Sequence, residues 1–318
     1  MRDRARVALV GCGTWGKNLL RVLASEPGAD VACVIDTDPR ARQAAALMAP
    51  RARVQDCVFA LRDRNVDAVV IATPGPLHAS HALLAIECGA HVFVEKPLAL
   101  STVDASRIVD AASRRGVIGM VGHVLHYHPA VQVMIELVRS ATLGRPLRMH
   151  SKRCSLAGSR DVDGSVLWSL APHDLSILRA IDPSPIARLN VESRSSALAT
   201  LEVETSAGLR ANLLVSRVAE RKIRRIEIEC ERGSIVFDDL AASGKLCVWR
   251  DGDPVVHHPV YEEAEPLRQE VRAFLRALRD GVSPATDLRE GLAVVTLLAQ
   301  AGGKLESTLS SPPVFAHR

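Results

Sequence analysis

The sequence predicts an α/β protein: a doubly wound parallel sheet comes first, and an α+β domain with a mostly antiparallel, open sheet follows it. Three observations carry this prediction. Strand and helix signals alternate through the first third of the chain, a glycine-rich loop directly follows the first strand, and the later strands switch to an alternation of apolar and charged residues.

Short apolar runs alternate with helical periodicities in the first third. The runs are bounded by glycine or polar residues, as expected for strands covered on both faces. A strand–helix–strand rhythm builds right-handed βαβ units and a parallel sheet. The predicted strands cover residues 7–10, 31–36, 67–73, 90–95 and 117–122, and the predicted helices cover residues 15–25, 77–89 and 101–116.

The pattern changes in the rest of the chain. Residues 187–217 and 224–239 alternate apolar with polar or charged residues, with a turn at Arg232-Gly233. This alternation is typical of an antiparallel sheet with one covered face. Two helices, at residues 263–280 and 287–308, close the chain. We therefore predict one domain over residues 1–122 and a second over residues 123–318, with the last helices packing back on the first domain as an alternative.

Composition narrows the class of protein. Of the 318 residues, 47% are hydrophobic and 24% are charged, which is ordinary for a globular protein, and the net charge is only +4. The arginines are scattered and no apolar run has membrane-spanning length, so we expect neither nucleic acid nor membrane as a partner. The seven cysteines form no CxxC pair. That favours a reducing compartment, and we expect a cytoplasmic protein without a signal peptide.

The loop from Gly11 to Gly16 has the pattern GxGxxG, and it lies between a strand and a helix as dinucleotide binding requires. Gly11 suits the tight turn, Gly13 lets a pyrophosphate approach the backbone, and Gly16 allows close packing of the helix. Thr14 and Trp15 open the helix whose N-terminus faces the phosphate charge. The first domain is therefore predicted to be a Rossmann domain.

Asp36 follows the second predicted strand, where a carboxylate accepts hydrogen bonds from the adenosine ribose. An acid at this place repels a 2′-phosphate, so NAD is the expected cofactor, while the nearby Arg40 and Arg42 keep NADP as the alternative. Asp38 precedes Pro39, and this pair is typical of a helix N-cap followed by proline at the first helical position.

Three further segments carry a resemblance to a known family: Ala72-Thr73-Pro74 with His78, Glu95-Lys96-Pro97, and the segment Trp168 to Asp174, which reads WSLAPHD. Together with the glycine loop and residues 266–298, they make the chain similar to the Gfo/Idh/MocA oxidoreductases over nearly its whole length.

The resemblance implies roles for individual residues. Thr73, Pro74 and His78 would lie along the cofactor, and His123, at the domain junction, would touch it. Glu95 and Lys96 would lie by the nicotinamide, the Lys96-Pro97 bond would be cis, and Lys96 would reach the reacting oxygen. His173 would be the acid–base partner in the second domain. Removal of a hydride from a carbinol requires a base at the oxygen, which suits these residue types.

The sequence departs from the family at Ser169, where the family usually has aspartate. A serine supplies no negative charge to the histidine four residues later. Three alternatives follow: Lys96 and His173 suffice, Asp174 or Asp163 compensates, or activity is reduced.

Simpler interpretations stand beside these roles. Lys96 could be a structural lysine at a strand end, and His173 could be a satisfied core histidine. His123, His126 and His128 lack the further ligands that a metal site needs, so we expect no metal.

The expected reaction is hydride transfer at a ring carbon of a sugar, with a nucleotide-linked sugar as the first choice and with Arg160, Lys96, Ser169 and His173 as substrate contacts. The alternatives are a free-sugar or inositol dehydrogenase, and a cofactor-binding sensor or partner protein with little turnover. The family's open second sheet also implies a homodimer or homotetramer.

Overall fold

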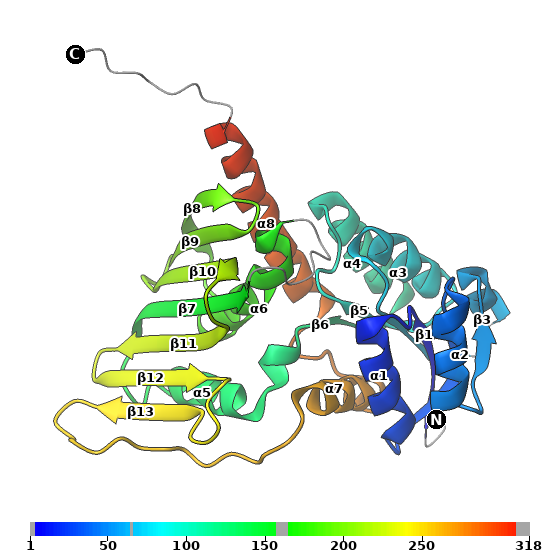
Figure 1. The fold of residues 1–318 in the computed structure, drawn as a ribbon, viewed down its shortest axis with the longest axis horizontal. Helices are drawn as coiled ribbons and strands as arrows, with labels where there is room; N and C mark the ends of the chain where they lie inside the picture. The colour runs from blue at the N-terminus through cyan, green and yellow to red at the C-terminus, as the bar shows by residue number, and fades with distance from the viewer. Residues whose placement is uncertain (1–3, 64–65, 157–164, 310–318) are drawn as a thin grey trace. The chain divides into compact units, whose positions relative to one another are not determined.

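The chain divides into two compact units in the computed structural model, which describes residues 4–63, 66–156 and 165–309 (Figure 1). Unit 1 comprises Met1–Pro129 and Glu263–Val295, and unit 2 comprises Ala130–Glu262 and Thr296–Arg318. Unit 1 therefore extends beyond the predicted boundary at residue 122 and takes in a late segment of the chain.

Unit 1 is built on a six-stranded sheet with the order β3-β2-β1-β4-β5-β6, in which every neighbouring pair is parallel. This is the doubly wound order, and it confirms the predicted parallel sheet. Because the strand order reverses between β1 and β4, ligands of such sheets bind beyond the carboxyl ends of these strands. The strands are β1 (Ala5–Val10), β2 (Ala29–Ile35), β3 (Arg53–Gln55), β4 (Ala68–Ile71), β5 (His91–Glu95) and β6 (Gly119–Gly122).

Helices occupy the connections between these strands. The short β3 was not among the predicted elements, since it has only three residues and an exposed arginine, and the helix before it was predicted only through its N-cap. The prediction of Asp38 as an N-cap is confirmed, because its side chain accepts a hydrogen bond from the Arg40 backbone N–H at 2.9 Å. The helices are α1 (Thr14–Ser25), α2 (Pro39–Met48), η1 (Val58–Asp63), η2 (Gly75–Leu77), α3 (His78–Glu87), α4 (Thr102–Arg115) and η3 (Val124–Tyr127).

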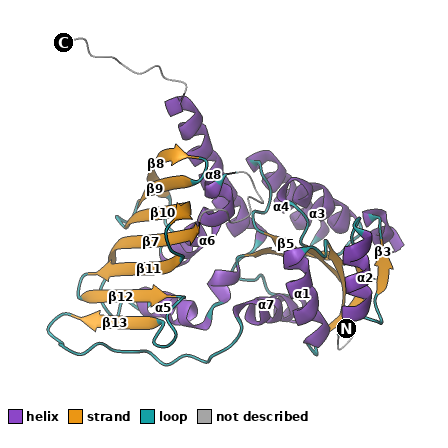
Figure 2. Ribbon diagram, viewed as in Figure 1, coloured by secondary structure: helices purple, strands orange, loops and turns teal. Residues whose placement is uncertain are grey.

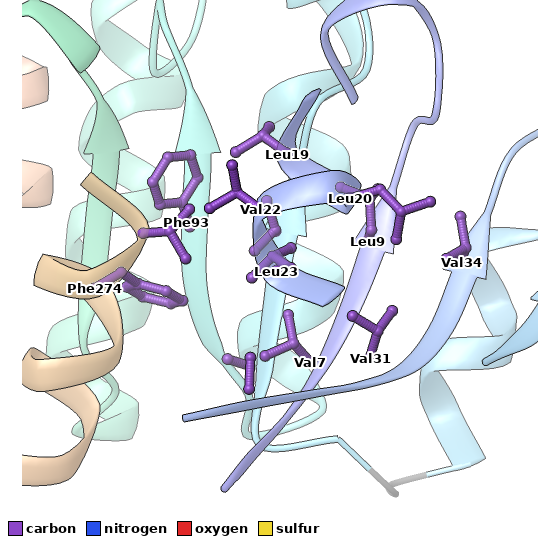
Figure 3. Packing of buried hydrophobic residues seen from close by; sticks show 14 of the residues in the cluster. Val7, Leu9, Leu19, Leu20, Val22, Leu23, Val31, Val34, Phe93 and Phe274 are labelled. Atoms are coloured by element: carbon purple, nitrogen blue, oxygen red, sulfur yellow. The ribbon is translucent and has the colours of Figure 1, made fainter. Parts of the chain in front are cut away.

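The late helix α7 (Pro266–Asp280) joins the core of unit 1. Leu9 of β1 and Leu19 and Leu23 of α1 are fully buried in the same cluster as Phe93 of β5 and Phe274 of α7 (Figure 3). The two phenylalanine rings meet edge to face, with centroids 5.7 Å apart. Such a contact adds to the area that the rings bury, so α7 is fixed in unit 1 by apolar packing.

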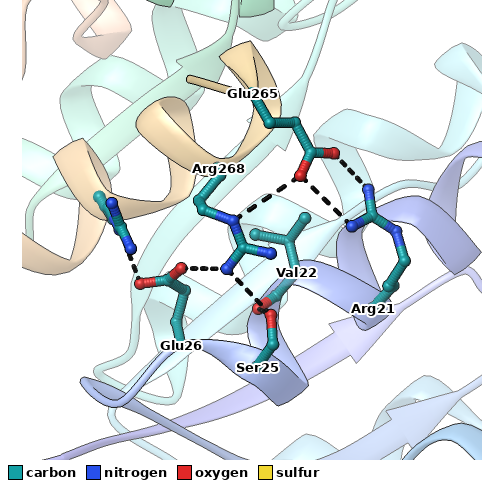
Figure 4. Close-up of polar contacts among 7 residues, drawn as sticks. Arg21, Val22, Ser25, Glu26, Glu265 and Arg268 are labelled. Carbon is teal, nitrogen blue, oxygen red and sulfur yellow. Dashed lines mark hydrogen bonds and ion pairs between the residues drawn. The ribbon is translucent and has the colours of Figure 1, made fainter. Parts of the chain in front are cut away.

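Ion pairs also join α7 to α1 (Figure 4). The buried Glu26 carboxylate accepts from Arg268 at 2.5 Å and from Arg272 at 2.9 Å, and Arg21 pairs with Glu265. Burial opposes ionisation of Glu26, but the hydrogen bonds from Arg272 and Arg268 outweigh it and lower the pKa of Glu26. The carboxylate is therefore charged and held in place at neutral pH.

Unit 2 is built on a seven-stranded sheet with the order β13-β12-β11-β7-β10-β9-β8 (Figure 2). All neighbouring pairs are antiparallel except β7 with β10, so the predicted mostly antiparallel sheet is confirmed. Strand β9 shows the alternation in its burial, with every second residue buried. The strands are β7 (Pro146–Leu156), β8 (Ile186–Ser195), β9 (Leu198–Thr205), β10 (Arg210–Ala219), β11 (Ile223–Cys230), β12 (Gly233–Asp238) and β13 (Leu246–Arg250).

The remaining helices are α5 (Pro129–Arg139), α6 (Val166–Ile181) and α8 (Leu288–Leu309). The side chain of Ser165 caps α6 by accepting from the Leu167 backbone N–H, and α6 contacts β7, β9 and β10 of the unit 2 sheet. Among the described residues, no helix is both long and apolar enough to cross a membrane. The cysteines are all free thiols.

Candidate functional site

The glycine loop of unit 1 shows a steric reason for Gly11 and for Gly16, and open space beside Gly13. Gly11 has a φ of +91°, and a Cβ there would lie 2.7 Å from the Ala72 backbone. A Cβ on Gly16 would lie 2.1 Å from the Gly11 carbonyl oxygen, whereas a Cβ on Gly13 would meet nothing within 4 Å. Gly11 and Gly16 thus allow close packing. Gly13 is exposed at the N-terminus of α1, and the space beside it is open. A pyrophosphate fits there against backbone N–H groups.

Asp36 is tied to this loop. One carboxylate oxygen accepts from the Cys12 backbone N–H at 2.6 Å, and the other accepts from the Asp38 backbone N–H at 2.8 Å. Burial first and then the charge of Asp36 raise the pKa of the Cys12 thiol, so Cys12 is protonated and contributes its backbone. The carboxylate lies beside the glycine loop at the carboxyl end of β2, as the adenosine end of a dinucleotide requires.

His78 joins the loops that follow β4 and β5. It is buried, with its Nδ1 2.7 Å from the Pro97 carbonyl oxygen and its Nε2 2.8 Å from the Thr73 carbonyl oxygen. Both partners are acceptors, so a ring that carries both hydrogens satisfies both contacts. The side chain of Thr73 lies 3.3 Å from His81. The structure thus shows His78 bridging two loops, while cofactor contacts of Thr73, Pro74 and His78 stay predictions.

Glu95 ends β5, and its side chain contacts three elements. Its Oε1 accepts from the indole N–H of Trp15 at 2.5 Å, and its Oε2 lies 3.3 Å from the Lys96 backbone N–H. A Cβ on Gly122 of β6 would lie 2.9 Å from the Glu95 carboxyl carbon, so the carboxylate occupies the space that the glycine leaves. Lys96 follows with the expected cis bond to Pro97. The sequence did not predict the Trp15–Glu95 contact, which joins residues 80 positions apart.

His123 follows β6 and is fully buried. Burial, then the nearby His126, then the charge of Lys96 lower the pKa of His123 to about 3. Its Nε2 lies 3.6 Å from the Glu290 carboxylate. His123 is therefore a neutral imidazole at neutral pH, and it lies close enough to Lys96 to feel its charge. Glu95, Lys96 and His123 are thus neighbours at the carboxyl edge of the parallel sheet.

Unit 2 carries the second group of predicted residues on α6. Ser169 and His173 lie four residues apart and so share one face of the helix. Arg217 of β10, which is only 8% exposed, donates to the Ser169 hydroxyl and to the Ser165 carbonyl oxygen. The family's usual aspartate position is therefore held here by a serine that accepts from a buried arginine. Arg160 and Asp163 lie outside the described residues.

Asp174, the next residue on α6, is fully buried in an ion pair. It accepts from Arg153 at 2.8 and 2.9 Å and from the Ser151 hydroxyl at 2.7 Å. A bidentate arginine together with a hydroxyl occupies both carboxylate oxygens. The suggestion that Asp174 compensates for the missing aspartate is therefore corrected: Asp174 links α6 to β7 inside unit 2.

Sequence reasoning missed several charged residues with buried side chains in the part of the chain that the structure describes, among them Arg153, Arg217 and Glu270. A signal existed for Glu270, which shares the helical spacing of the apolar residues Leu267, Val271 and Phe274 in α7. The arginines carried no comparable signal, because their partners lie on α6 or at its N-cap and are brought near by the packing of that helix on the sheet, and not by spacing along the chain.

Residues 5–123 match the family model named GFO_IDH_MocA, which is described as an oxidoreductase family with an NAD-binding Rossmann fold. Over 146 residues the chain is 34% identical to a 2,7-anhydro-N-acetylneuraminate hydratase of Mediterraneibacter gnavus, which covers 46% of this chain and 38% of that protein. Over 197 residues it is 32% identical to the UDP-N-acetylglucosamine 3-dehydrogenase of Acidithiobacillus ferrooxidans, which covers 60% of this chain and 61% of that protein. These two matches therefore span less than two thirds of the relatives' own lengths.

Other similarities extend over the whole chain. An inositol 2-dehydrogenase of Saccharopolyspora erythraea is 28% identical in a 325-residue alignment that covers 97% of this chain and 95% of that protein. The solved structure of the Acidithiobacillus ferrooxidans dehydrogenase matches with a TM-score of 0.87 at 25% identity, over 97% of this chain and 100% of that chain.

Proposed function

We propose, on the premise that residues 5–123 match the model of the Gfo/Idh/MocA oxidoreductase family, that the chain transfers a hydride between NAD and a ring carbon of a sugar, with a nucleotide-linked sugar as the first choice. The observation that carries the proposal is the carboxyl edge of the parallel sheet. There the open glycine loop, the Asp36 carboxylate and Lys96 follow the ends of β1, β2 and β5.

The residues fit a dinucleotide. Gly13 leaves space at the N-terminus of α1 for the pyrophosphate, and Asp36 is held by two backbone N–H groups where it accepts from ribose hydroxyls. A carboxylate there disfavours a 2′-phosphate, which supports NAD over NADP. When bound, NAD supplies the hydride acceptor or donor.

Lys96 is proposed as the group that takes the proton of the reacting hydroxyl. Oxidation of a carbinol removes a hydride from carbon and a proton from oxygen, so a group must hold that oxygen and take its proton. The backbone of Lys96 is held against Glu95, and its charge acts on His123. Because His123 is neutral, it adds no positive charge beside the lysine. His173 is proposed as the second acid–base group and Ser169 as a substrate contact.

The nucleotide-sugar class is supported by the whole-chain similarity to the structure of the UDP-N-acetylglucosamine 3-dehydrogenase. The similarity to an inositol 2-dehydrogenase over 97% of this chain supports the second candidate, oxidation of a free polyol or inositol. We further propose a cytoplasmic homodimer or homotetramer, in line with the free thiols of the seven cysteines.

The test follows NAD reduction by absorbance with UDP- and dTDP-hexoses, free hexoses and inositol. Lys96→Met should lower kcat/KM by about 10²–10⁴-fold, the usual contribution of a general base. Its control, Lys222→Met, changes an exposed lysine and should keep wild-type turnover. NAD binding, measured by calorimetry, should persist in both variants.

The outcomes separate the candidates. Turnover of inositol or a free sugar without turnover of any nucleotide sugar would replace the first substrate class by the second. Cofactor binding without turnover on the panel would favour the sensor or partner protein. Wild-type turnover in Lys96→Met would refute the assignment of Lys96.

A further inference from the structure

A carboxyl group lies inside unit 1 where apolar side chains would be expected. Glu270 is fully buried on the face of α7 that also carries Val271 and Phe274. Neither of its carboxyl oxygens has a hydrogen-bond partner among the described residues. An isolated carboxylate in such a place is strongly disfavoured, so the neutral acid is the stable form.

The packing of α7 on β5 brings Glu270 toward Glu95. Phe274 meets Phe93 edge to face, with ring centroids 5.7 Å apart (Figure 3). Glu270 lies one helical turn from Phe274, and Glu95 lies two residues from Phe93 on the same face of the strand, so both carboxyl groups are one step from this contact. Burial first, and then the charge of Glu95, raise the pKa of Glu270.

Charged and titratable groups surround Glu270 on several elements. On α7 itself, Arg268 and Arg272 are both bound to Glu26 (Figure 4). On η3, burial raises the pKa of Tyr127, which lies near Glu270 and near Glu290 of α8.

The groups near Glu95 are hydrogen-bond donors and a neutral histidine. Glu95 itself, on β5, accepts from the Trp15 indole and lies 3.3 Å from the Lys96 backbone N–H. His123 lies near Lys96 and is neutral at neutral pH. Glu95 is therefore supplied with donors that favour its charged form, whereas Glu270 has none, and two neighbouring buried carboxyl groups do not ionise together readily.

We propose that Glu95 and Glu270, the buried carboxyl pair, hold one proton between them, carried by Glu270, and that the pair releases this proton when the cationic nicotinamide of NAD binds beside Glu95. Glu270 is then a positioning residue that acts through Glu95. In the release step the O–H bond of the protonated carboxyl breaks and the proton passes to a buffer base, which leaves both groups ionised. The pair takes a proton back when the neutral reduced nicotinamide replaces the cation. The second half of this inference rests on the proposed function.

Calorimetry tests the coupling. NAD, NADH and ADP-ribose are titrated into the whole protein in buffers of different ionisation enthalpy, and the dependence of the measured heat on the buffer gives the protons released. NAD should release up to about one proton per site, whereas NADH and ADP-ribose, which lack the cationic ring, should release almost none. Because release accompanies binding, NAD affinity should rise with pH in the wild-type protein.

Two variants separate this role from a structural one. Glu270→Gln should abolish the release and flatten the pH dependence of NAD affinity. Glu26→Gln, which changes another buried carboxylate of unit 1, should leave both unchanged. Release of protons by Glu270→Gln at the wild-type level, or NAD binding to the wild-type protein without release, would overturn the coupling.

A measurement on the cofactor-free wild-type protein tests the shared proton by itself. Carbon-13 spectra of protein labelled at glutamate side-chain carboxyls should show one buried carboxyl that stays protonated at neutral pH. Titration of every glutamate in the ordinary acidic range would overturn the shared proton. If NAD, NADH and ADP-ribose all fail to bind, the proposed function falls and the coupling with it, while the spectra still decide the sharing.

Discussion

Replacement of Asp36 by alanine should reverse the preference for NAD. The carboxylate has two roles, since it holds the glycine loop and occupies the place where a 2′-phosphate would lie. Its oxygens accept from the backbone N–H groups of Cys12 at 2.6 Å and of Asp38 at 2.8 Å. In Asp36→Ala the exposed Asp38 N–H donates a hydrogen bond to water instead, but the buried Cys12 N–H loses its acceptor.

The magnitude follows from these contacts. A buried donor left without a partner costs about 1–3 kcal/mol, and the lost acceptor for the ribose hydroxyls costs about 1–1.5 kcal/mol. The first cost destabilises the free and the bound protein alike, so NAD binding weakens by the second cost, about tenfold, since about 1.4 kcal/mol is a factor of ten. NADP loses the loop contact too. However, it is relieved of a repulsion of about 3–4 kcal/mol per unit charge at an effective dielectric constant of about 20, before screening by salt.

The assay is calorimetric titration of the wild-type protein and Asp36→Ala with NAD and with NADP. The ratio of NADP to NAD dissociation constants should fall by at least about 100-fold, and by less at high salt because the repulsion is screened. Asp38→Ala is the control, since it removes only the cap of α2 and should cost about 1 kcal/mol of stability without a change of preference. An unchanged ratio in Asp36→Ala would refute the assignment of Asp36 to the adenosine ribose.

Three further predictions concern charged positions. Asp174→Asn should lower the free energy of unfolding in urea by about 3–5 kcal/mol, because it leaves Arg153 buried without its bidentate partner; a loss below about 1 kcal/mol would contradict a structural role. Glu26, whose pKa is lowered, contributes stability at pH values above the usual 4.5 and loses it as the pH falls through the lowered value. Glu26→Gln should therefore cost about 1 kcal/mol near neutral pH, after discounting for its partly exposed arginine partners, and flatten the acid limb of a Tm–pH curve; an unchanged limb would show that the ion pairs add nothing. Ser169→Asp should change kcat by less than about threefold, because Arg217 would neutralise the new carboxylate, whereas a gain of about 100-fold, as for a new general base, would contradict this.

The sequence predicted the first sheet well because its signals are local. Apolar runs placed the second strand at residues 31–36, and the structure has it at Ala29–Ile35. The roles of the three glycines could be predicted one by one, since each follows from the position of that glycine in the loop between β1 and α1. The parallel pairing of β7 with β10 was not predictable in the same way, because residues 62 or 63 positions apart meet in it and alternation along each strand says nothing about the partner.

The candidate site divides on the same principle. The residue types of the motifs were predicted, but the contacts that decide their roles come from elsewhere in the chain. Trp15 reaches Glu95, Arg217 reaches Ser169, and Arg153 reaches Asp174. Each pair depends on the way in which a helix packs on the finished sheet. No pattern of the kind that identified the motifs reports it.

Motif membership alone therefore does not assign a catalytic role, and the contacts of each side chain separate two kinds of motif residue. Asp174 stands next to His173, but its oxygens are taken up by Arg153 and Ser151, so it stabilises α6 against β7. Both ring nitrogens of His78 lie within hydrogen-bond distance of backbone carbonyl oxygens. Gly13, in contrast, is exposed on open space. A residue whose polar atoms are hydrogen-bonded inside the fold determines the shape of the site. The reaction is carried out by the residues that face the place where ligands bind.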